Sequence, residues 1–264
     1  MIDRASITQW AGRVPWNDPA QVEQDLIISR ALVAIFSDEF LASQLAFRGG
    51  TALHKLYLSP QPRYSEDIDL VQIHPGPIKP ILFRLGEVLD FLPDRVTQQK
   101  RYNNTMLFRM ESEVPPVVPI RLKIEINCVE HFNELGLVKM PFAVESHWFT
   151  GQCAITTYAL NELLGTKLRA LYQRKKGRDL FDLYVALTEA EVNTSEILQC
   201  YNRYMAFSVQ QAPTYKQFVA NMEAKMADPD FLGDTRVFLR PERPFDPQAG
   251  YEAVRAQLID GLKK

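Results

Sequence analysis

The stretch FRGGTALHKLYLSPQPRYSEDIDL (residues 47–70) places a Gly-Gly-Thr sequence shortly before Asp67 and Asp69. We expect residues 67–73 to form a strand, and alternate residues of a strand project from the same face. Both carboxylates would therefore point to one place, where their like charges are unfavourable unless a cation lies between them. Paired carboxylate oxygens are typical ligands of Mg²⁺. The acidic pair predicts a magnesium site.

The Gly-Gly-Thr sequence, Gly49, Gly50 and Thr51, is typical of a phosphate-binding turn. It opens an expected short helix over residues 50–58, and amides at the start of a helix attract anions. Glycines let the backbone approach a ligand closely, and the threonine hydroxyl adds a polar group. We therefore expect this motif to cradle nucleotide phosphates. Two residues just before the acidic pair are further candidate phosphate contacts: Arg63 and Ser65.

Each motif alone has a plainer interpretation. A Gly-Gly before a helix is often only a loop, and an Asp-x-Asp at the end of a strand is often only a solvated edge. The two motifs together, with a helix between them and a strand after them, favour a nucleotide and metal site.

The composition is that of an ordinary globular protein. The 264 residues are enough for one large domain or two closely packed domains, and 46% of them are hydrophobic. The net charge of -2 gives no overall basic field, so any nucleic-acid surface must be local. The three cysteines, Cys128, Cys153 and Cys200, are far apart and form no CxxC motif, which argues against a disulfide framework or a zinc site.

The compartment follows from the same sequence. The polar N-terminus has no signal-peptide pattern, and the longest apolar stretch, LIISRALVAIF, contains Arg30 and is too short to span a bilayer. We expect a cytoplasmic protein with no membrane partner.

The clearest strand pattern comes from residues 120–128, IRLKIEINC, in which apolar and polar residues alternate without a fault. Residues 105–111 alternate as well, and the link VPPVVP between the two indicates neighbouring strands. Glu125 lies on the polar face. If this strand lies beside residues 67–73, Glu125 would be a third carboxylate at the metal site. The alternative is an exposed carboxylate opposite Lys123 or Arg121.

From about residue 158 the apolar period becomes helical. We expect an α/β fold: residues 1–155 form an α/β core that includes helices over 18–37 and 78–92, and residues 156–264 form a helical domain. We expect the helical domain to pack on the core and to complete the active site, because no Gly/Ser linker separates the two.

Lys167 is the most informative residue of the helical part. In the expected helix over 160–176, a turn of about 100° per residue places Lys167 in the middle of the apolar stripe, and Arg174 falls close to the same line. A lysine on a buried face either extends its ammonium to solvent or meets a fixed anion, and a triphosphate is such an anion. Arg169 lies on the opposite, polar side.

The following segment, RKKGRDLFDLYVAL, predicts that Gly177 ends the first helix and that a second helix starts at Arg178. We expect its core face to exclude Asp179 and Asp182. Asp179 has an alternative role as a first-turn carboxylate favoured by the helix dipole. Clustered cations here predict a local surface for RNA phosphates, with a simple solvated helix end as the alternative. The candidate RNA-binding residues are Arg169, Arg174, Lys175, Lys176 and Arg178.

The motifs FRGGTALHKLY, RYSEDIDL, LKIEIN and KLRALYQRKKGRDLFDL, in this order, resemble the AbiEii/AbiGii (MenT-like) nucleotidyltransferase toxins. The resemblance covers about residues 21–187. It implies a polymerase-β-type nucleotidyltransferase fold, with a mixed sheet flanked by helices. It also implies a toxin of a type IV toxin–antitoxin or phage abortive-infection system, with a cognate antitoxin as partner. Mg²⁺-dependent transfer from an NTP is implied, for MenT-like members onto the 3′ end of tRNA.

The resemblance also assigns site residues. The first family motif falls on the Gly-Gly-Thr sequence and the second on Asp67 and Asp69. The lysine motif falls on Lys167, and the last aspartate falls on Asp182 or the neighbouring Asp179. Two other functions remain open: nucleotide transfer onto a protein hydroxyl, and NTP binding by a regulatory module without turnover.

Overall fold

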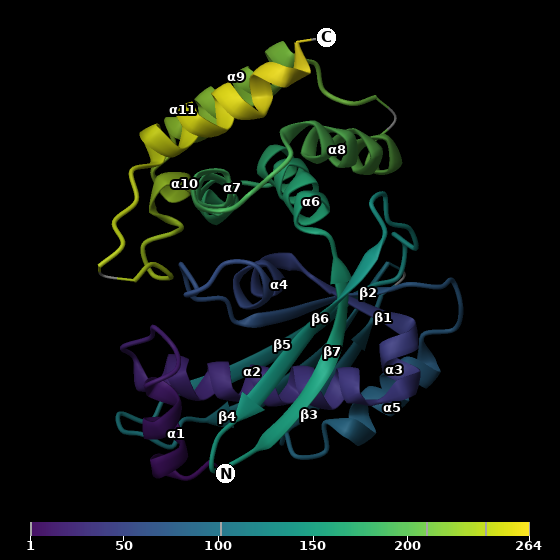
Figure 1. Cartoon of the computed structure of the whole chain (residues 1–264), viewed down its shortest axis with the longest axis vertical. Coiled ribbons are helices and arrows are strands. Elements are labelled where there is room, and N and C mark those ends of the chain that lie inside the picture. The colour runs from purple at the N-terminus through teal and green to yellow at the C-terminus, as the bar shows by residue number, and fades with distance from the viewer. Residues whose placement is uncertain (1, 101, 210, 241, 264) are drawn as a thin grey trace. The chain divides into compact units, whose positions relative to one another are not determined.

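The computed structural model describes residues 2–100, 102–209, 211–240 and 242–263. The chain divides into two compact units (Figure 1). The sheet unit comprises Met1–Phe132 and Leu137–Tyr158, and the helical unit comprises Asn133–Gly136 and Ala159–Lys264.

Seven strands within the described residues form one mixed sheet in the order β3-β4-β5-β2-β1-β7-β6. β2 lies near the centre, antiparallel to β1 and parallel to β5. The sheet thereby brings the acidic pair on β2 beside both the Gly-Gly-Thr segment, which follows β1, and the polar face of β5. The strands are β1 (Leu45–Arg48), β2 (Asp67–Gln72), β3 (Arg95–Gln99), β4 (Asn103–Glu111), β5 (Pro119–Asn127), β6 (Leu137–Glu145) and β7 (Thr150–Tyr158).

The alternating pattern correctly predicts β4 and β5 as antiparallel neighbours. On β5, Leu122, Ile124 and Ile126 are fully buried, and the polar residues between them lie on the other face. This burial of every second side chain is what fixes the register of the strand, because a slip of one residue would exchange the two faces.

β1 and β7 were not expected from the sequence. Leu45, Ala46 and Phe47 of β1 are all buried, so the strand shows no alternation and its short apolar run is not distinguishable from a piece of helix. β7 is buried only toward its end, next to β1.

Five helices of the sheet unit are described: α1 (Arg4–Ala11), α2 (Pro19–Ser37), α3 (Glu39–Gln44), α4 (Gly49–Leu56) and α5 (Lys79–Val88). α2 is the long helix that runs across the sheet in Figure 1 and packs on β5, β6 and β7. As predicted, Asp18 caps it, accepting a hydrogen bond from the amide of Ala20 at 2.9 Å, and Pro19 begins it.

Asp25 on α2 holds several segments of the sheet unit together. It is buried and accepts hydrogen bonds from Nε1 of Trp10 at 3.0 Å and of Trp16 at 3.2 Å. Nζ of Lys55, in the last turn of α4, lies 2.8 Å from its Oδ2. Burial alone would raise the pKa of Asp25, but Lys55 and the indole donors outweigh it and hold that pKa below its ordinary value. The pair anchors α4 to α2.

The helical unit contains α6 (Leu160–Gln173), α7 (Gly177–Glu189), α8 (Thr194–Ser208), α9 (Tyr215–Met226), α10 (Pro229–Gly233), α11 (Pro247–Gln257) and the 3-10 turn η1 (Ile259–Leu262). Buried Glu162 on α6 accepts hydrogen bonds from the amides of Glu134 and Leu135 at 2.7 and 2.9 Å. Tyr204 on α8 donates to the same carboxylate at 2.8 Å. These bonds attach the segment between β5 and β6 to the helical unit.

The predicted boundary at Gly177 is wrong. α6 ends at Gln173, and Gly177 begins α7. Arg174 and Lys176 are extended, with φ of -128° and -132°, and they form the link between the helices. A Cβ on Gly177 would lie 2.2 Å from the carbonyl oxygen of Phe231. The glycine is therefore required where α7 approaches the backbone of α10, and it does not terminate a helix.

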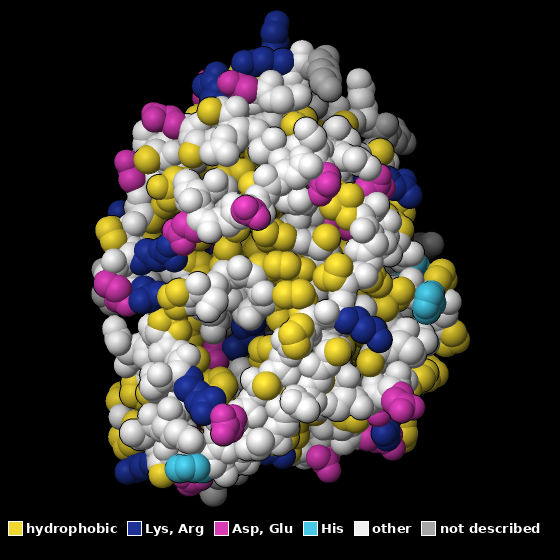
Figure 2. Space-filling model, in the orientation of Figure 1, with side chains coloured by type: hydrophobic (Ala, Val, Ile, Leu, Met, Phe, Trp, Pro, Cys, Tyr) yellow, Lys and Arg dark blue, Asp and Glu magenta, His cyan; other side chains and the backbone are white. Residues whose placement is uncertain are grey.

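The surface carries charges of both signs. On the face drawn in Figure 2, Lys and Arg side chains are interspersed with Asp and Glu, as the net charge of -2 leads one to expect. Among the described residues, no helix is both long and apolar enough to cross a bilayer.

Candidate active site

Gly49 lies directly against the side chain of Asp69. β1 passes directly into α4, and Gly49, the first residue of the helix, has a φ of +83°. A Cβ built on it would lie 2.1 Å from Oδ2 of Asp69. Only glycine adopts this backbone readily and leaves room for the carboxylate. The first motif of the sequence thus lies against the second.

The start of α4 presents free backbone donors. Its N-cap residue, Arg48, makes no side-chain capping hydrogen bond. The first-turn amides of a helix have no partner within the helix, and the helix dipole favours a negative charge near them. The amides of Gly50 and Thr51 are therefore suited to bind phosphate oxygens beside Asp69.

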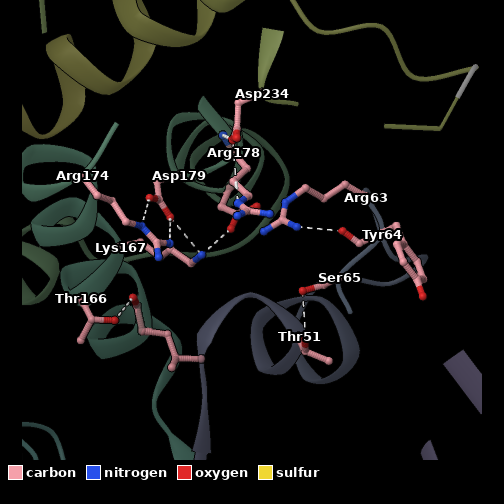
Figure 3. A network of polar contacts seen from close by, with 12 residues as sticks. Thr51, Arg63, Tyr64, Ser65, Thr166, Lys167, Arg174, Arg178, Asp179 and Asp234 are labelled. Carbon is pink, nitrogen blue, oxygen red and sulfur yellow. Dashed lines mark hydrogen bonds and ion pairs between the residues drawn. The ribbon is translucent and has the colours of Figure 1, made fainter. Parts of the chain in front are cut away.

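The Thr51 hydroxyl makes hydrogen bonds within the protein. Thr51 is buried; its Oγ1 lies 2.8 Å from Oγ of Ser65 and donates to the carbonyl of Asp67 at 2.5 Å (Figure 3). This contact ties α4 to the beginning of β2. It gives Thr51 and Ser65 a role in positioning the acidic pair, and it leaves the backbone amides as the candidate phosphate-binding groups of the motif.

Arg63 lies in the loop between α4 and β2. It is 2% exposed, and its Nη1 donates to the carbonyl of Tyr64 at 2.8 Å (Figure 3). Tyr64 in turn packs edge-on against Trp16, with the ring centroids 5.3 Å apart. The loop is thus well packed, and a contact between Arg63 and phosphate stays a prediction.

Three carboxylates share one face of β2 and β5. The two strands are parallel neighbours, and the register pairs Asp69 with Glu125 and Asp67 with Lys123. The strand that carries Glu125 therefore lies beside residues 67–73, as a role for Glu125 as a third carboxylate requires. Lys123 comes between the acids: its Nζ is 3.1 Å from Oδ2 of Asp67 and 3.3 Å from Oε2 of Glu125.

Burial and mutual repulsion make the two aspartates unusual. Burial, followed by the charge of Asp67, raises the pKa of Asp69 above its ordinary value. Burial also raises the pKa of Asp67, although Lys123 opposes that shift. At both aspartates, burial and the neighbouring acids thus outweigh the nearby cations, which lower the pKa.

The residues present fit a divalent ion at the aspartates. The ammonium of Lys123 balances one of the three carboxylate charges of Asp67, Asp69 and Glu125, and two negative charges are left over. All the donor atoms are carboxylate oxygens, the hard ligands that Mg²⁺ prefers. Besides its contact with Lys123, the carboxylate of Glu125 accepts a hydrogen bond at its Oε1 from Nδ2 of Asn103 at 3.2 Å. Within the described part of the chain, no cluster of three or more His, Cys, Asp or Glu side chains is arranged as a ready metal cage. Glu125 as a ligand stays a prediction.

In the helical unit, Lys167 meets fixed anions of the protein. Lys167 on α6 is 6% exposed, and its Nζ lies 2.7 Å from Oδ2 of Asp182 and 3.3 Å from Oδ1 of Asp179 (Figure 3). Arg174 approaches the same Asp179, with Nε 2.6 Å from Oδ2 and Nη2 2.8 Å from Oδ1. The cations and carboxylates of α6 and α7 thus form one network.

The prediction that Asp179 and Asp182 lie away from the core face of α7 is wrong. Both are fully buried, because they face Lys167 on α6. Burial raises the pKa of Asp179, but Lys167 and Arg174 outweigh this and lower it below the ordinary value. Asp179 is therefore an ionised partner of two cations, and Asp182 is a second carboxylate partner of Lys167.

The candidate RNA-binding cations are paired with acids of the same unit. Nε of Arg178 is 3.8 Å from Oδ2 of Asp234 (Figure 3). Nζ of Lys176 is 3.3 Å from Oδ1 of the same aspartate. Lys175 pairs with Asp228. Arg169 lies elsewhere on α6, where its Nη1 donates to Oγ of Ser208 at 2.9 Å.

Sequence reasoning missed several supporting residues. Lys123 appears in the sequence only as a neighbour of Glu125, and its contact with Asp67 requires the pairing of β2 with β5. Arg48 pairs with Glu130, and its charge also lowers the pKa of Asp69, against the larger effects of burial and Asp67. The sequence places Lys123 on the same polar face of β5 as Glu125, and this alternation was the one signal that Lys123 lies near the acidic residues.

Comparison with known proteins identifies the family and the fold. The model of the family described as nucleotidyl transferase AbiEii toxin, type IV toxin–antitoxin system, matches residues 30–260. In fold, the chain is similar to MenT4, a nucleotidyltransferase toxin from Mycobacterium tuberculosis H37Rv. That match has 15% identity, covers 97% of this chain and 88% of MenT4, and has a TM-score of 0.63.

A second solved structure, a provisionally assigned nucleotidyltransferase from H. pylori, is 16% identical. The match covers 92% of this chain and 94% of the other, with a TM-score of 0.53. No curated protein matches the chain in sequence.

The mixed sheet flanked by helices is similar to the fold of these solved nucleotidyltransferases. Because the family model spans most of its length, the chain belongs to the AbiEii family of nucleotidyltransferase toxins from type IV toxin–antitoxin systems. Membership implies an NTP substrate and an antitoxin partner.

Proposed function

We propose that the chain transfers a nucleotide from an NTP·Mg²⁺ complex to a hydroxyl group of RNA. The observation that carries this proposal is the contact of Gly49 with Asp69: the start of α4, which suits phosphates, lies against a carboxylate that lacks counter-charge. A triphosphate and a divalent ion supply the two complementary charges.

In this mechanism, the amides of Gly50 and Thr51 bind the β- and γ-phosphates, and Asp67 and Asp69 hold Mg²⁺. Bound there, Mg²⁺ would neutralise charge that develops at the α-phosphate and at the leaving group. The acceptor hydroxyl loses its proton to solvent, its oxygen forms a bond to the α-phosphorus, and the bond from that phosphorus to the leaving pyrophosphate breaks. The protein contributes position and charge, which is how phosphoryl-type transfer is generally catalysed.

We propose that Lys167 contributes a point charge to the triphosphate. Its support is local: a lysine that is 6% exposed and held by two buried carboxylates has a fixed position, as a phosphate-binding group requires. Asp179 and Asp182 are then positioning residues that act through Lys167. Arg174, bonded to Asp179, is a second candidate for contact with the triphosphate.

The acceptor that the family resemblance favours is tRNA, at its 3′ end, and growth arrest would follow because modified acceptors can no longer be charged. The cations of residues 169–178 are the proposed contacts for RNA phosphates. A cytoplasmic location belongs to the same proposal, since both the nucleotide and the RNA are found there.

The test is to incubate the protein with Mg²⁺, total RNA, total protein and each α-labelled NTP in turn. The expected result is label in RNA of tRNA size with one preferred NTP. Label in protein would support the transfer of nucleotides onto a protein hydroxyl instead. Nucleotide binding by calorimetry without pyrophosphate release would support a regulatory module without turnover.

A further inference from the structure

The Nζ atom of Lys123 lies between two of the three carboxylates, 3.1 Å from Asp67 and 3.3 Å from Glu125. The contact with Asp67 joins β5 to β2, which the sheet register places side by side, and the contact with Glu125 lies within β5. Neither the glycine motif nor the acidic pair assigns a function to this lysine. Its ammonium neutralises the same oxygens that a divalent ion would use.

The contact is one that can open. The side chains of Lys123, Asp67 and Glu125 are each about one third exposed, at 33%, 34% and 33%, so water reaches all three. Lysine carries its charge at the end of four flexible methylenes and makes no rigid, two-pronged bond with a carboxylate. The carboxylates of Asp67 and Glu125 therefore hold the ammonium of Lys123 in place only while no cation that binds them more strongly is present.

Arg48 differs from Lys123 in this respect. It lies near Asp69 but pairs with Glu130, whose side chain is 8% exposed. The charge of Arg48 is thus committed to a partner outside the acidic cluster. Lys123 is the cation that contacts the acidic cluster directly among the ion pairs of the described residues.

We propose that Lys123 is a built-in counter-ion of the carboxylate site, which weakens the binding of free divalent ions so that the metal binds chiefly together with the nucleotide. A divalent ion that enters alone must displace the ammonium or remain close to it, and both cost free energy. When an NTP binds, its negative phosphates lie at the start of α4. These phosphates attract both the displaced ammonium and the metal ion. The proposal rests on the proposed metal site at Asp67 and Asp69.

The test measures Mn²⁺ binding to the metal-free protein by electron paramagnetic resonance, without nucleotide and with a saturating NTP analogue that resists transfer. Lys123→Met removes one positive charge within ~5 Å of the ion, so without nucleotide this variant should bind Mn²⁺ about tenfold more tightly, or tighter still, than the unaltered protein does. With the analogue present, the difference from the unaltered protein should shrink to about twofold, since the phosphates already compensate the ammonium. Lys123→Gln makes the same charge change with a polar side chain and should agree.

Two controls make the result specific. Lys123→Arg keeps the charge and should bind Mn²⁺ about as the unaltered protein does. Lys139→Met removes an exposed lysine from another strand, β6, and should change nothing. Equal or weaker Mn²⁺ binding by folded Lys123→Met and Lys123→Gln would overturn the proposal.

A third variant separates this inference from the metal site itself. Asp69→Asn should weaken Mn²⁺ binding at least tenfold whether or not Lys123 is altered. If Asp69→Asn has no effect, the proposed metal site fails. If it has the expected effect while the Lys123 variants do not bind more tightly, the metal site stands and the role of Lys123 as a counter-ion is wrong.

Discussion

A methyl group on Gly49 would lie 2.1 Å from the Oδ2 atom of Asp69. The proposed phosphate-binding turn and the proposed metal-binding acid, which are separated by a helix and a loop in the sequence, therefore form one structural feature. A change at the glycine must displace the carboxylate or the helix start, and either movement would disturb the bound triphosphate.

Gly49→Ala is expected to lower nucleotide transfer at least 100-fold, because it strains a φ of +83° and drives the Asp69 side chain aside. The matched control is Gly136→Ala. Gly136 has a φ of +86°, but nothing lies within 4 Å of its Cβ position. The Gly136→Ala variant should lose ~1–2 kcal/mol of stability from backbone strain alone and should keep its transfer activity. Equal losses of activity in both variants would show that strain and not the contact with Asp69 matters.

Asp69→Asn should stabilise the metal-free protein at neutral pH. Because burial and Asp67 raise the pKa of Asp69, the folded state holds this proton to a higher pH than the unfolded chain does. The contribution of protonated Asp69 to the free energy of unfolding is fully present below the ordinary pKa of 3.8 and is lost as the pH rises through the raised pKa of the folded state. One pKa unit corresponds to ~1.4 kcal/mol, or roughly 3–6 °C in melting temperature for a domain of this size.

The measurement is thermal unfolding with a chelator at pH 7 and near pH 4. The variant should melt higher than the unaltered protein at pH 7 and nearly equally at pH 4. Asp90→Asn, at an exposed aspartate, is the control and should show no such pH dependence. A lower melting temperature for Asp69→Asn at pH 7 would mean that the carboxylate is well compensated and that no cation is needed.

Asp179→Ala should destabilise the helical unit by ~3–5 kcal/mol, because it leaves Lys167 and Arg174 without their shared buried partner. Asp230→Ala, at an exposed aspartate of α10, should cost less than ~1 kcal/mol. Urea unfolding of both variants measures the difference. Similar unfolding midpoints for the two would contradict the view that Asp179 is the hub of the network.

Asp234→Asn should tighten the binding of RNA. It releases Lys176 and Arg178 from their carboxylate partner, so more positive charge is available to phosphates. The expected effect is a two- to fivefold gain in affinity at low salt, with a steeper loss of affinity as salt rises. Asp260→Asn, which releases Lys263 at 3.0 Å in a distant part of the sequence, is the control. An unchanged affinity for Asp234→Asn would place the RNA surface elsewhere.

The sequence predicts local features of this protein well. The alternation over residues 120–128 gives β5, and the cap at Asp18 gives the start of α2, since both depend on neighbours in the chain. The Gly-Gly-Thr and Asp-x-Asp motifs also predict elements of the correct type, a helix start and a strand.

Features that depend on distant pairing escape such reasoning. The role of Lys123 requires the parallel register of β2 with β5, which no local pattern specifies. The burial of Asp179 and Asp182 requires that a lysine on another helix faces them, whereas their polarity alone favours solvent. Gly177 looks like a helix terminator because its contact with Phe231 comes from a segment far along the chain.

The incorporation of α-labelled NTP into RNA by Asp69→Asn tests the central claim most directly, when it is compared with the unaltered protein and with Asp90→Asn. The account predicts that Asp69→Asn, folded and at saturating Mg²⁺, loses at least 1,000-fold of the incorporation rate while Asp90→Asn keeps it, because the ion and the triphosphate are no longer held together. Incorporation by Asp69→Asn at the rate of the unaltered protein would contradict the assignment of β2 and the start of α4 as the active site.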